Sequence, residues 1–106
     1  MTAQEKIVSD LLRRHTNTFG YVSGKELADC SGLESTKSLR SVIHSLRLQG
    51  EPICSSNAGY WYAKTDAELI ENSNKIESFA LSVLKAARGM RSILVDQIGM
   101  DGGKYE

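Results

Sequence analysis

The sequence predicts a mainly α-helical protein with one β-hairpin and a long C-terminal helix. Three observations predict this class. Apolar residues recur at helical spacing through the first half of the chain, and the period changes to two after Gly50. A second and much longer helical stripe then follows residue 65. We therefore expect a compact domain at residues 1–64, a helix at residues 65–98 and a flexible tail at residues 99–106.

Length and composition narrow the class of protein. The chain has 106 residues, and thirteen Lys and Arg balance thirteen Asp and Glu. No strong overall charge therefore draws it to nucleic acid or to a membrane surface. No apolar run approaches the ~20 residues that cross a bilayer, and the first residues lack the apolar segment of a signal peptide. We expect a cytoplasmic protein.

The first helix is expected at residues 3–15, followed by a break at residues 17–20. Its apolar residues share one helical face: Ile7, Val8, Leu11 and Leu12. Tyr21 and Val22 should form a short extended piece before the next helix.

The second helix should be short. Ser23 is a suitable N-cap for a helix beginning near Gly24 or Lys25. The helix covers little more than two turns before Ser31 and Gly32 stop it, and Leu33 is expected to fill the turn that follows.

The third helix is predicted from a cap at Ser35 or Thr36 to an end at Gly50, so it covers residues 35–49. One apolar stripe runs along it: Leu39, Val42, Ile43 and Leu46. When this stripe faces the core, the opposite face presents polar side chains, namely Thr36, Lys37, Arg40, Ser41, His44 and Arg47. Such a face suits the major groove of DNA, where Arg and Lys reach guanine edges or phosphates. A helix face that contacts only solvent would have the same composition, so this second interpretation stays open.

A β-hairpin should follow, with strands at residues 52–54 and 60–62 and a turn at residues 55–59. Pro52 cannot donate a ladder hydrogen bond and belongs at the start of an edge strand. Tyr60, Trp61 and Tyr62 alternate between the two faces of their strand. They form either an aromatic surface for bases or a partner, or the closure of the core under the hairpin, which we favour.

The last helix should begin at a Thr65 or Asp66 cap and run to about Asp96. Two rows of residues at heptad spacing, offset by 3 and 4 residues, are typical of a helix–helix seam. We expect a homodimer through this seam, with these residues at its centre: Leu69, Ile76, Ala80, Val83, Ala87 and Met90. Ser73 and Leu94 continue the second row. Alternatively, the helix breaks near Gly89 and folds back over its own domain.

The order of elements and several short motifs also resemble a known family. The residues that carry the likeness are Ser23-Gly24-Lys25-Glu26-Leu27-Ala28, Gly32-Leu33, Ile43-His44-Ser45-Leu46-Arg47-Leu48-Gln49-Gly50 and Gly59-Tyr60-Trp61. Over residues 3 to about 63 the chain resembles the winged helix-turn-helix DNA-binding domain of biotin operon repressors and small winged-helix proteins of bacteriophages and prophages.

The resemblance implies a non-enzymatic protein that binds duplex DNA and regulates transcription, or replication and recombination. Its DNA contacts would come from the third helix and from the hairpin turn: Ser35, Thr36, Lys37, Arg40, Ser41, His44, Arg47, Ser56 and Asn57.

A second hypothesis belongs to another class, a winged-helix module that binds a host or phage protein and has little affinity for DNA. Residues 1–64 hold eight Lys and Arg against six acids, so the expected DNA-binding region is only weakly basic. Ala58 stands where related hairpins often carry Lys or Arg. Weak binding and a steep dependence on salt are therefore expected for a monomer on DNA.

We expect no catalytic site, metal or cofactor. The sequence has no P-loop and no nucleophile elbow. His15 and His44 lie far apart without further ligands at metal-binding spacing, and Cys30 and Cys54 are too few for a disulfide framework.

Overall fold

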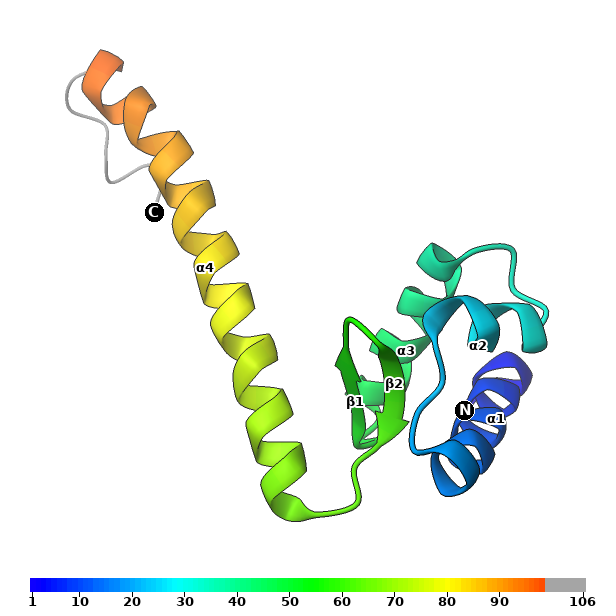
Figure 1. The fold of residues 1–106 in the computed structure, drawn as a ribbon. Helices are drawn as coiled ribbons and strands as arrows, with labels where there is room; N and C mark the ends of the chain where they lie inside the picture. Colours follow the sequence, from blue (N-terminus) through cyan, green and yellow to red (C-terminus); the bar gives the residue numbers. More distant parts are fainter. Residues whose placement is uncertain (99–106) are drawn as a thin grey trace. The chain divides into compact units, whose positions relative to one another are not determined.

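The computed structural model describes residues 1–98, and the side chains of residues 1–94. It confirms a mainly α-helical chain with a single two-stranded hairpin among these residues and a long C-terminal helix (Figure 1). The elements follow in this order: α1 (Ala3–Phe19), α2 (Gly24–Cys30), α3 (Thr36–Leu48), β1 (Ile53–Ser56), β2 (Gly59–Tyr62) and α4 (Asp66–Ile98). The tail expected at residues 99–106 lies outside the described residues.

The chain divides into two compact units. The first is Met1–Asn72, which holds α1 to β2 and the first turns of α4, and the second begins at Ser73. The boundary between the units therefore falls within α4.

Helix α1 is longer than the sequence predicted. Thr2 and Glu5 form a reciprocal capping box at its start. The expected end at residue 15 is wrong, because Thr16 is buried on the core side and its hydroxyl bonds back to the Leu12 carbonyl (2.8 Å). The helix ends only at Gly20, whose φ of 88° turns the backbone out of the helix.

The caps expected for the next two helices are confirmed. Ser23 accepts a hydrogen bond from the Glu26 amide and Ser35 accepts one from the Ser38 amide (3.1 and 3.2 Å). Between the two helices the Leu33 amide donates to the Ala28 carbonyl (2.9 Å), and the Leu33 side chain packs against the core, as expected.

The hairpin has a tighter turn than predicted. Ser56 pairs with Gly59, so the turn consists of Asn57 and Ala58 instead of residues 55–59. The first strand begins at Ile53, one residue after Pro52. A further antiparallel bridge joins Val22 to Tyr60, which confirms the extended piece after α1 and attaches it to the free edge of β2.

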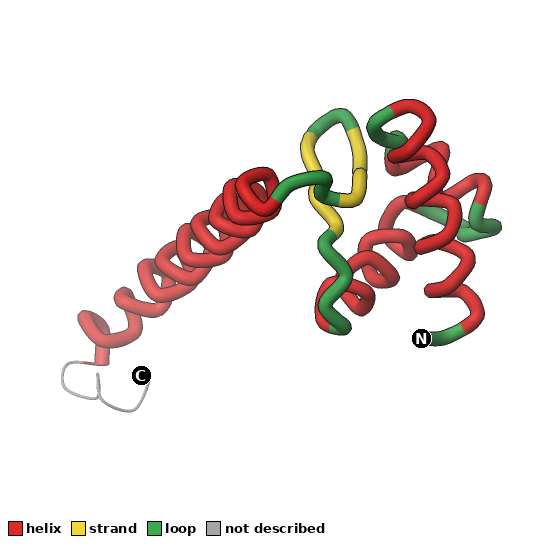
Figure 2. Tube along the Cα trace, turned by 90° about the horizontal axis from the view of Figure 1, so that it is seen from below, coloured by secondary structure: helices red, strands yellow, loops and turns green. Residues whose placement is uncertain are grey.

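The core of the first unit lies between α1, α2, α3 and the hairpin, as the views in Figure 1 and Figure 2 show. Each of these elements contributes at least one buried side chain. The cluster comprises Val8, Leu12, Val22, Leu27, Ala28, Leu39, Ile43, Leu46, Ile53 and Tyr62. The apolar stripe predicted for α3 therefore faces the core, because Val42 packs against the same cluster.

Two carboxylates join α1 to later parts of the chain. Glu5 accepts hydrogen bonds from Ser45 (2.5 Å) and Gln49 (3.2 Å) at the end of α3. Glu51 accepts from the Tyr62 hydroxyl (3.2 Å) and from Arg13 (3.3 Å). These side chains hold α3 and the hairpin in fixed positions against α1.

Helix α4 begins at a Thr65 cap, whose hydroxyl accepts from the Glu68 amide (3.1 Å). The helix continues without interruption through Gly89 to Ile98, as Figure 2 shows, so the break considered near Gly89 is absent. Within the first unit, Asn72 bonds to the amide and the carbonyl of Ser55 (3.2 and 2.8 Å).

Candidate nucleic-acid interface

The outer face of α3 is built by the same periodicity that buries its apolar stripe. With Leu39, Ile43 and Leu46 in the core, the side chains on the opposite face of the helix point outward. Five of the predicted DNA-contact residues on the helix are exposed: Thr36, Lys37, Arg40, Ser41 and His44. The structure therefore brings these five together on one accessible face.

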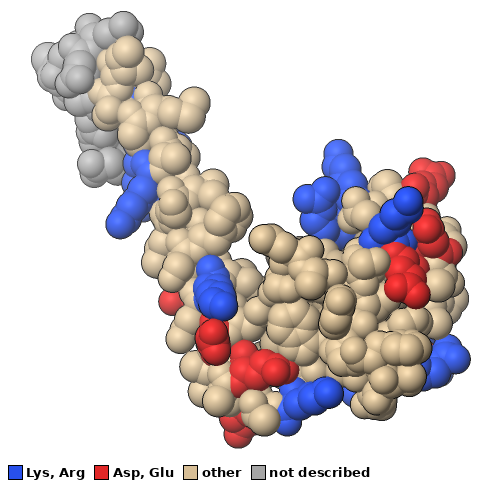
Figure 3. Space-filling view, viewed as in Figure 1, with Lys and Arg blue, Asp and Glu red and all other residues tan. Residues whose placement is uncertain are grey.

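The charge of this face has one sign. Helix α3 contains Lys37, Arg40 and Arg47 and no Asp or Glu. Acids occur on the neighbouring segments, at Asp29 in α2 and Glu34 in the turn, and both are exposed. Figure 3 shows basic side chains together at the top of the first unit with acidic ones beside them. The basic surface is thus local to α3.

Arg47 occupies a different position from the other predicted residues. Its guanidinium is half-buried and donates to the Ile53 carbonyl (2.9 Å) and to the Ser55 hydroxyl (3.0 Å). Burial lowers the pKa of Arg47 from its ordinary value. The side chain therefore fastens the end of α3 to β1, a structural role that helical periodicity does not predict.

Ser35 and the hairpin turn complete the predicted set. Ser35 is exposed, but its hydroxyl already caps α3. Ser56 and Asn57 are exposed at the hairpin tip, where the Ser56 hydroxyl accepts from the Ala58 amide (3.1 Å). The tip offers hydrogen-bonding groups and no positive charge.

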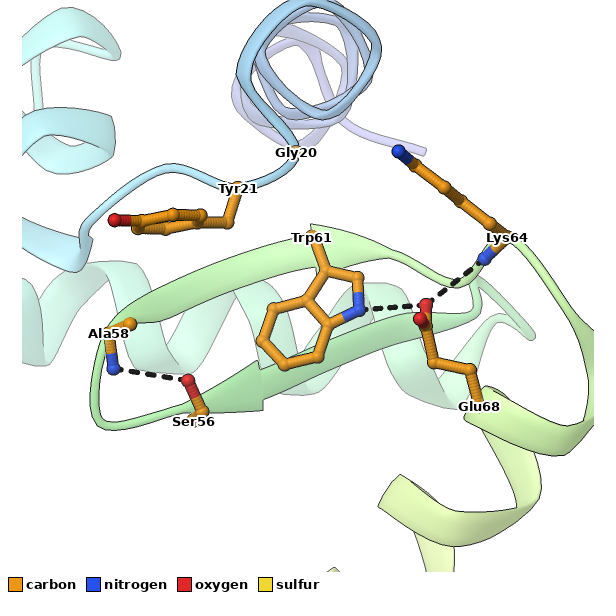
Figure 4. A pocket seen from close by; sticks show the side chains of 7 residues that line it. All are labelled: Gly20, Tyr21, Ser56, Ala58, Trp61, Lys64 and Glu68. Atoms are coloured by element: carbon orange, nitrogen blue, oxygen red, sulfur yellow. Dashed lines mark hydrogen bonds between the residues drawn. The ribbon is translucent and has the colours of Figure 1, made fainter.

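A shallow pocket of about 300 Å³ lies on the outer side of the hairpin (Figure 4). Trp61 and Tyr21 lie on its walls, and the Trp61 indole N–H donates to Glu68 (2.8 Å). The remaining lining residues are Gly20, Ser56, Ala58, Lys64 and Glu68. Tyr21 and Lys64 are far apart in sequence, and the Val22–Tyr60 bridge helps to bring them to one surface by attaching the segment after α1 to β2.

The three aromatic residues of β2 divide between its faces as expected. Tyr62 is buried in the core, and Tyr60 packs against the same cluster. Trp61 lies on the opposite face with Cys54, its partner in the hairpin register, and is only half-buried. Tyr60 and Tyr62 therefore close the core under the hairpin, which is the interpretation that we favoured.

The described residues show no arrangement for metal binding. No group of three His, Cys, Asp or Glu side chains among them could hold an ion. Cys30 is exposed, Cys54 is buried, and burial raises the pKa of the Cys54 thiol.

The residues predicted for dimerisation lie along α4 with their apolar side chains exposed. Leu69 is 37% exposed, Val83 is 53% and Met90 is 78%. Ile76 is also exposed, as is Ala80, whereas Ala87 is half-buried. No helix in the described part of the chain is long and apolar enough to span a membrane.

Comparison with protein-family models, with curated proteins and with solved structures found no match to this chain.

Proposed function

We propose that the chain is a winged-helix protein that binds duplex DNA by placing α3 in the major groove. The observation that carries this proposal is the outer face of α3, which is exposed, cationic and free of acids within the helix. Lys37 and Arg40 are long enough to reach bases or phosphates, and Thr36 and Ser41 are small enough to permit close approach.

The order of the elements supports the same proposal. A short helix, a tight turn and a second, longer helix precede the hairpin directly, and α3 is fastened to β1 by Arg47. A major groove about 12 Å wide admits one α-helix, and the hairpin tip would then lie near the backbone. The exposed Ser56 and Asn57 would donate to phosphate without adding charge.

We further propose that the protein acts as a homodimer through α4. A near-neutral protein makes few phosphate contacts, so one copy binds weakly. Two linked copies raise affinity through a high effective concentration at the second half-site. A regulatory role in transcription, or in phage replication and recombination, follows from the resemblance to winged-helix domains of repressors and phage proteins. A cytoplasmic setting is proposed because two cysteines are too few for a disulfide framework.

The test compares two double variants in a fluorescence titration of labelled duplex DNA. Lys37→Ala/Arg40→Ala should weaken binding by about 1–3 kcal/mol for each base that these side chains read, and it should reduce the salt dependence. Lys6→Ala/Arg14→Ala removes the same charge from exposed positions of α1 and should have little effect. Equal affinities for the two variants, both folded by circular dichroism, would contradict the placement of α3.

A second candidate function rests on the hairpin tip. Because Asn57 and Ala58 form an uncharged turn beside the Trp61 pocket, this face also fits a module that binds another protein. The same titration separates the candidates, since such a module would show no measurable binding to duplex DNA even at low salt.

A further inference from the structure

The apolar face of α4 is suited to a specific arrangement of two chains. We propose that α4 pairs with α4 of a second copy in antiparallel orientation, with Ala80 of each chain opposite Val83 of the other. The inference rests on the homodimer proposed above and names its geometry, but it does not depend on DNA binding. The face runs from Leu69 to Leu94, about 38 Å at 1.5 Å per residue.

Two rows of side chains make up this face, and they differ in size. One row is large and apolar: Leu69, Ile76, Val83 and Met90. The other row is small over most of its length: Ser73, Ala80 and Ala87, with Leu94 at its end. Antiparallel helices set one row against the other, whereas parallel helices set each row against itself.

In the antiparallel register the rows complement each other. Ala80 lies opposite the partner's Val83, and Ile76 lies opposite the partner's Ala87. Ser73 lies opposite the partner's Met90. Each of these three layers combines one small and one large side chain, which is the arrangement that fills an interface evenly. The outermost layer sets Leu69 against the partner's Leu94, so it holds two large side chains.

A parallel pair would pack unevenly. Ala80 would face the partner's Ala80, and Ala87 would face the partner's Ala87, which leaves voids between the helices. The layers of Val83 and Met90 would hold two large side chains each. Voids of this kind are destabilising because the surrounding side chains relax only partly.

Phe79, which flanks the seam, follows the same rule. Phe79 is 72% exposed and is the largest apolar side chain of the described part of α4. In the antiparallel register it lies beside the partner's Ala86, where a small side chain leaves room for the ring. In the parallel register the two Phe79 rings lie at the same level on opposite sides of the seam, away from the partner's Ala86.

Charge along α4 also distinguishes the two orientations. The acids of residues 66–94 all lie at its start: Asp66, Glu68, Glu71 and Glu77. One basic residue, Lys75, lies among these acids; the other three, Lys85, Arg88 and Arg91, come after residue 78, and no acid lies among them up to residue 94. Figure 3 shows acidic side chains near the start of α4 and basic ones further along.

Antiparallel pairing places residues 85–91 alongside residues 72–78 of the partner, a stretch that directly follows Glu71 and holds Glu77 and the single cation Lys75. Parallel pairing places the three cations of one chain beside the same three of the other. Like charges brought together oppose association, and charge patterns of this kind fix orientation and register more than they add affinity. Side-chain volume and charge therefore favour the same orientation.

Disulfide cross-linking of the full chain tests the orientation. In a Cys30→Ser background, which removes the exposed native thiol, Ser73→Cys and Met90→Cys are prepared as separate proteins, one of them carrying a size tag. The two are mixed, allowed to exchange and oxidised. The expected product is the mixed disulfide between Cys at 73 and Cys at 90, with each protein alone giving little dimer. Disulfides formed by each protein with itself, and not in the mixture, would overturn the antiparallel proposal.

A matched pair of variants tests whether this face makes the dimer at all. Val83 and Leu81 are both 53% exposed on α4, but only Val83 belongs to the seam. Light scattering should show that Val83→Glu lowers self-association at least tenfold while Leu81→Glu does not, and both should keep their helix content. A monomeric wild type at high micromolar concentration, or equal effects of the two variants, would contradict the pairing. Neither assay contains DNA, so this failure is distinguishable from failure of the proposed function.

Discussion

Glu5 is the most strongly perturbed acid in the described residues. Hydrogen bonds from Ser45, from the Thr2 amide and from Gln49 stabilise the carboxylate and lower the pKa of Glu5 from its ordinary value of 4.5 to about 2. Because the pKa is lower in the folded chain, the ionised group stabilises the fold at pH above about 4.5. This contribution is lost as the pH falls from about 4.5 towards about 2.

We therefore predict that Glu5→Gln lowers the melting temperature at neutral pH, and that the difference from wild type shrinks as the pH falls through this interval. Gln retains the ability to form a capping box. The main loss is therefore the negative charge that strengthens the hydrogen bonds donated by Ser45 and Gln49. Melting curves from pH 7 to pH 2 measure the effect. Glu34→Gln controls for the removal of one charge, since Glu34 is exposed. A constant difference between wild type and Glu5→Gln at every pH would contradict this role.

Among the glycines of residues 1–98, Gly59 has the least room for a side chain. Its φ is +151°, and a Cβ added there would lie 2.1 Å from the Val22 carbonyl oxygen, which is a backbone atom. We predict that Gly59→Ala destabilises the fold by at least about 2 kcal/mol, because the bridge between Val22 and Tyr60 must shift.

Chemical denaturation measures this change against Gly24→Ala as the control. A Cβ on Gly24 would meet its nearest neighbour, on the Tyr60 ring, at 3.5 Å, an ordinary contact. Gly24→Ala should therefore leave stability within about 1 kcal/mol of wild type. Similar stabilities for the two alanine variants would show that the hairpin does not approach residue 22 this closely.

At the scale of elements, Arg47 holds α3 to the hairpin. We predict that Arg47→Ala destabilises the protein by about 1–3 kcal/mol, because the Ile53 carbonyl and the Ser55 hydroxyl would each be left without their charged donor. Arg40→Ala, on the exposed face of the same helix, should change stability by no more than about 0.5 kcal/mol. Urea denaturation measures the free energy of unfolding of both variants. Equal losses of that free energy would refute the structural role of Arg47.

The elements show which features a sequence can predict. The stripe from Leu39 to Leu46, the serine caps and the hairpin were predictable because spacing and cap chemistry act locally. The true end of α1 was not, because Thr16 is kept helical by burial and by accepting a hydrogen bond from the Tyr62 amide (3.1 Å), 46 residues away. A pattern confined to neighbouring residues carries no signal of such a contact.

The candidate interface likewise contains some residues that local sequence patterns predict and others that only distant contacts explain. Thr36, Lys37, Arg40, Ser41 and His44 followed from helical periodicity, and they lie on one exposed face. Arg47 fits the same periodicity, yet its side chain turns to β1 because the hairpin offers it two acceptors. The pocket of Trp61 and Tyr21 depends on the bridge between residue 22 and β2, so spacing alone could not predict it.

At the scale of the whole molecule, the low charge of the chain is linked to the proposed dimer. The chain is electrically neutral overall, and its basic face is confined to one helix. A single copy should bind duplex DNA weakly, whereas a dimer presents two such faces.

The central claim is that this chain binds duplex DNA, and titration of a labelled random duplex with the wild-type protein at two salt concentrations tests it most directly. We predict micromolar binding at low salt that weakens steeply as salt rises, because Lys37 and Arg40 of both copies displace counterions from phosphates. Binding weaker than millimolar at low salt, by a protein shown to be folded, would contradict the claim.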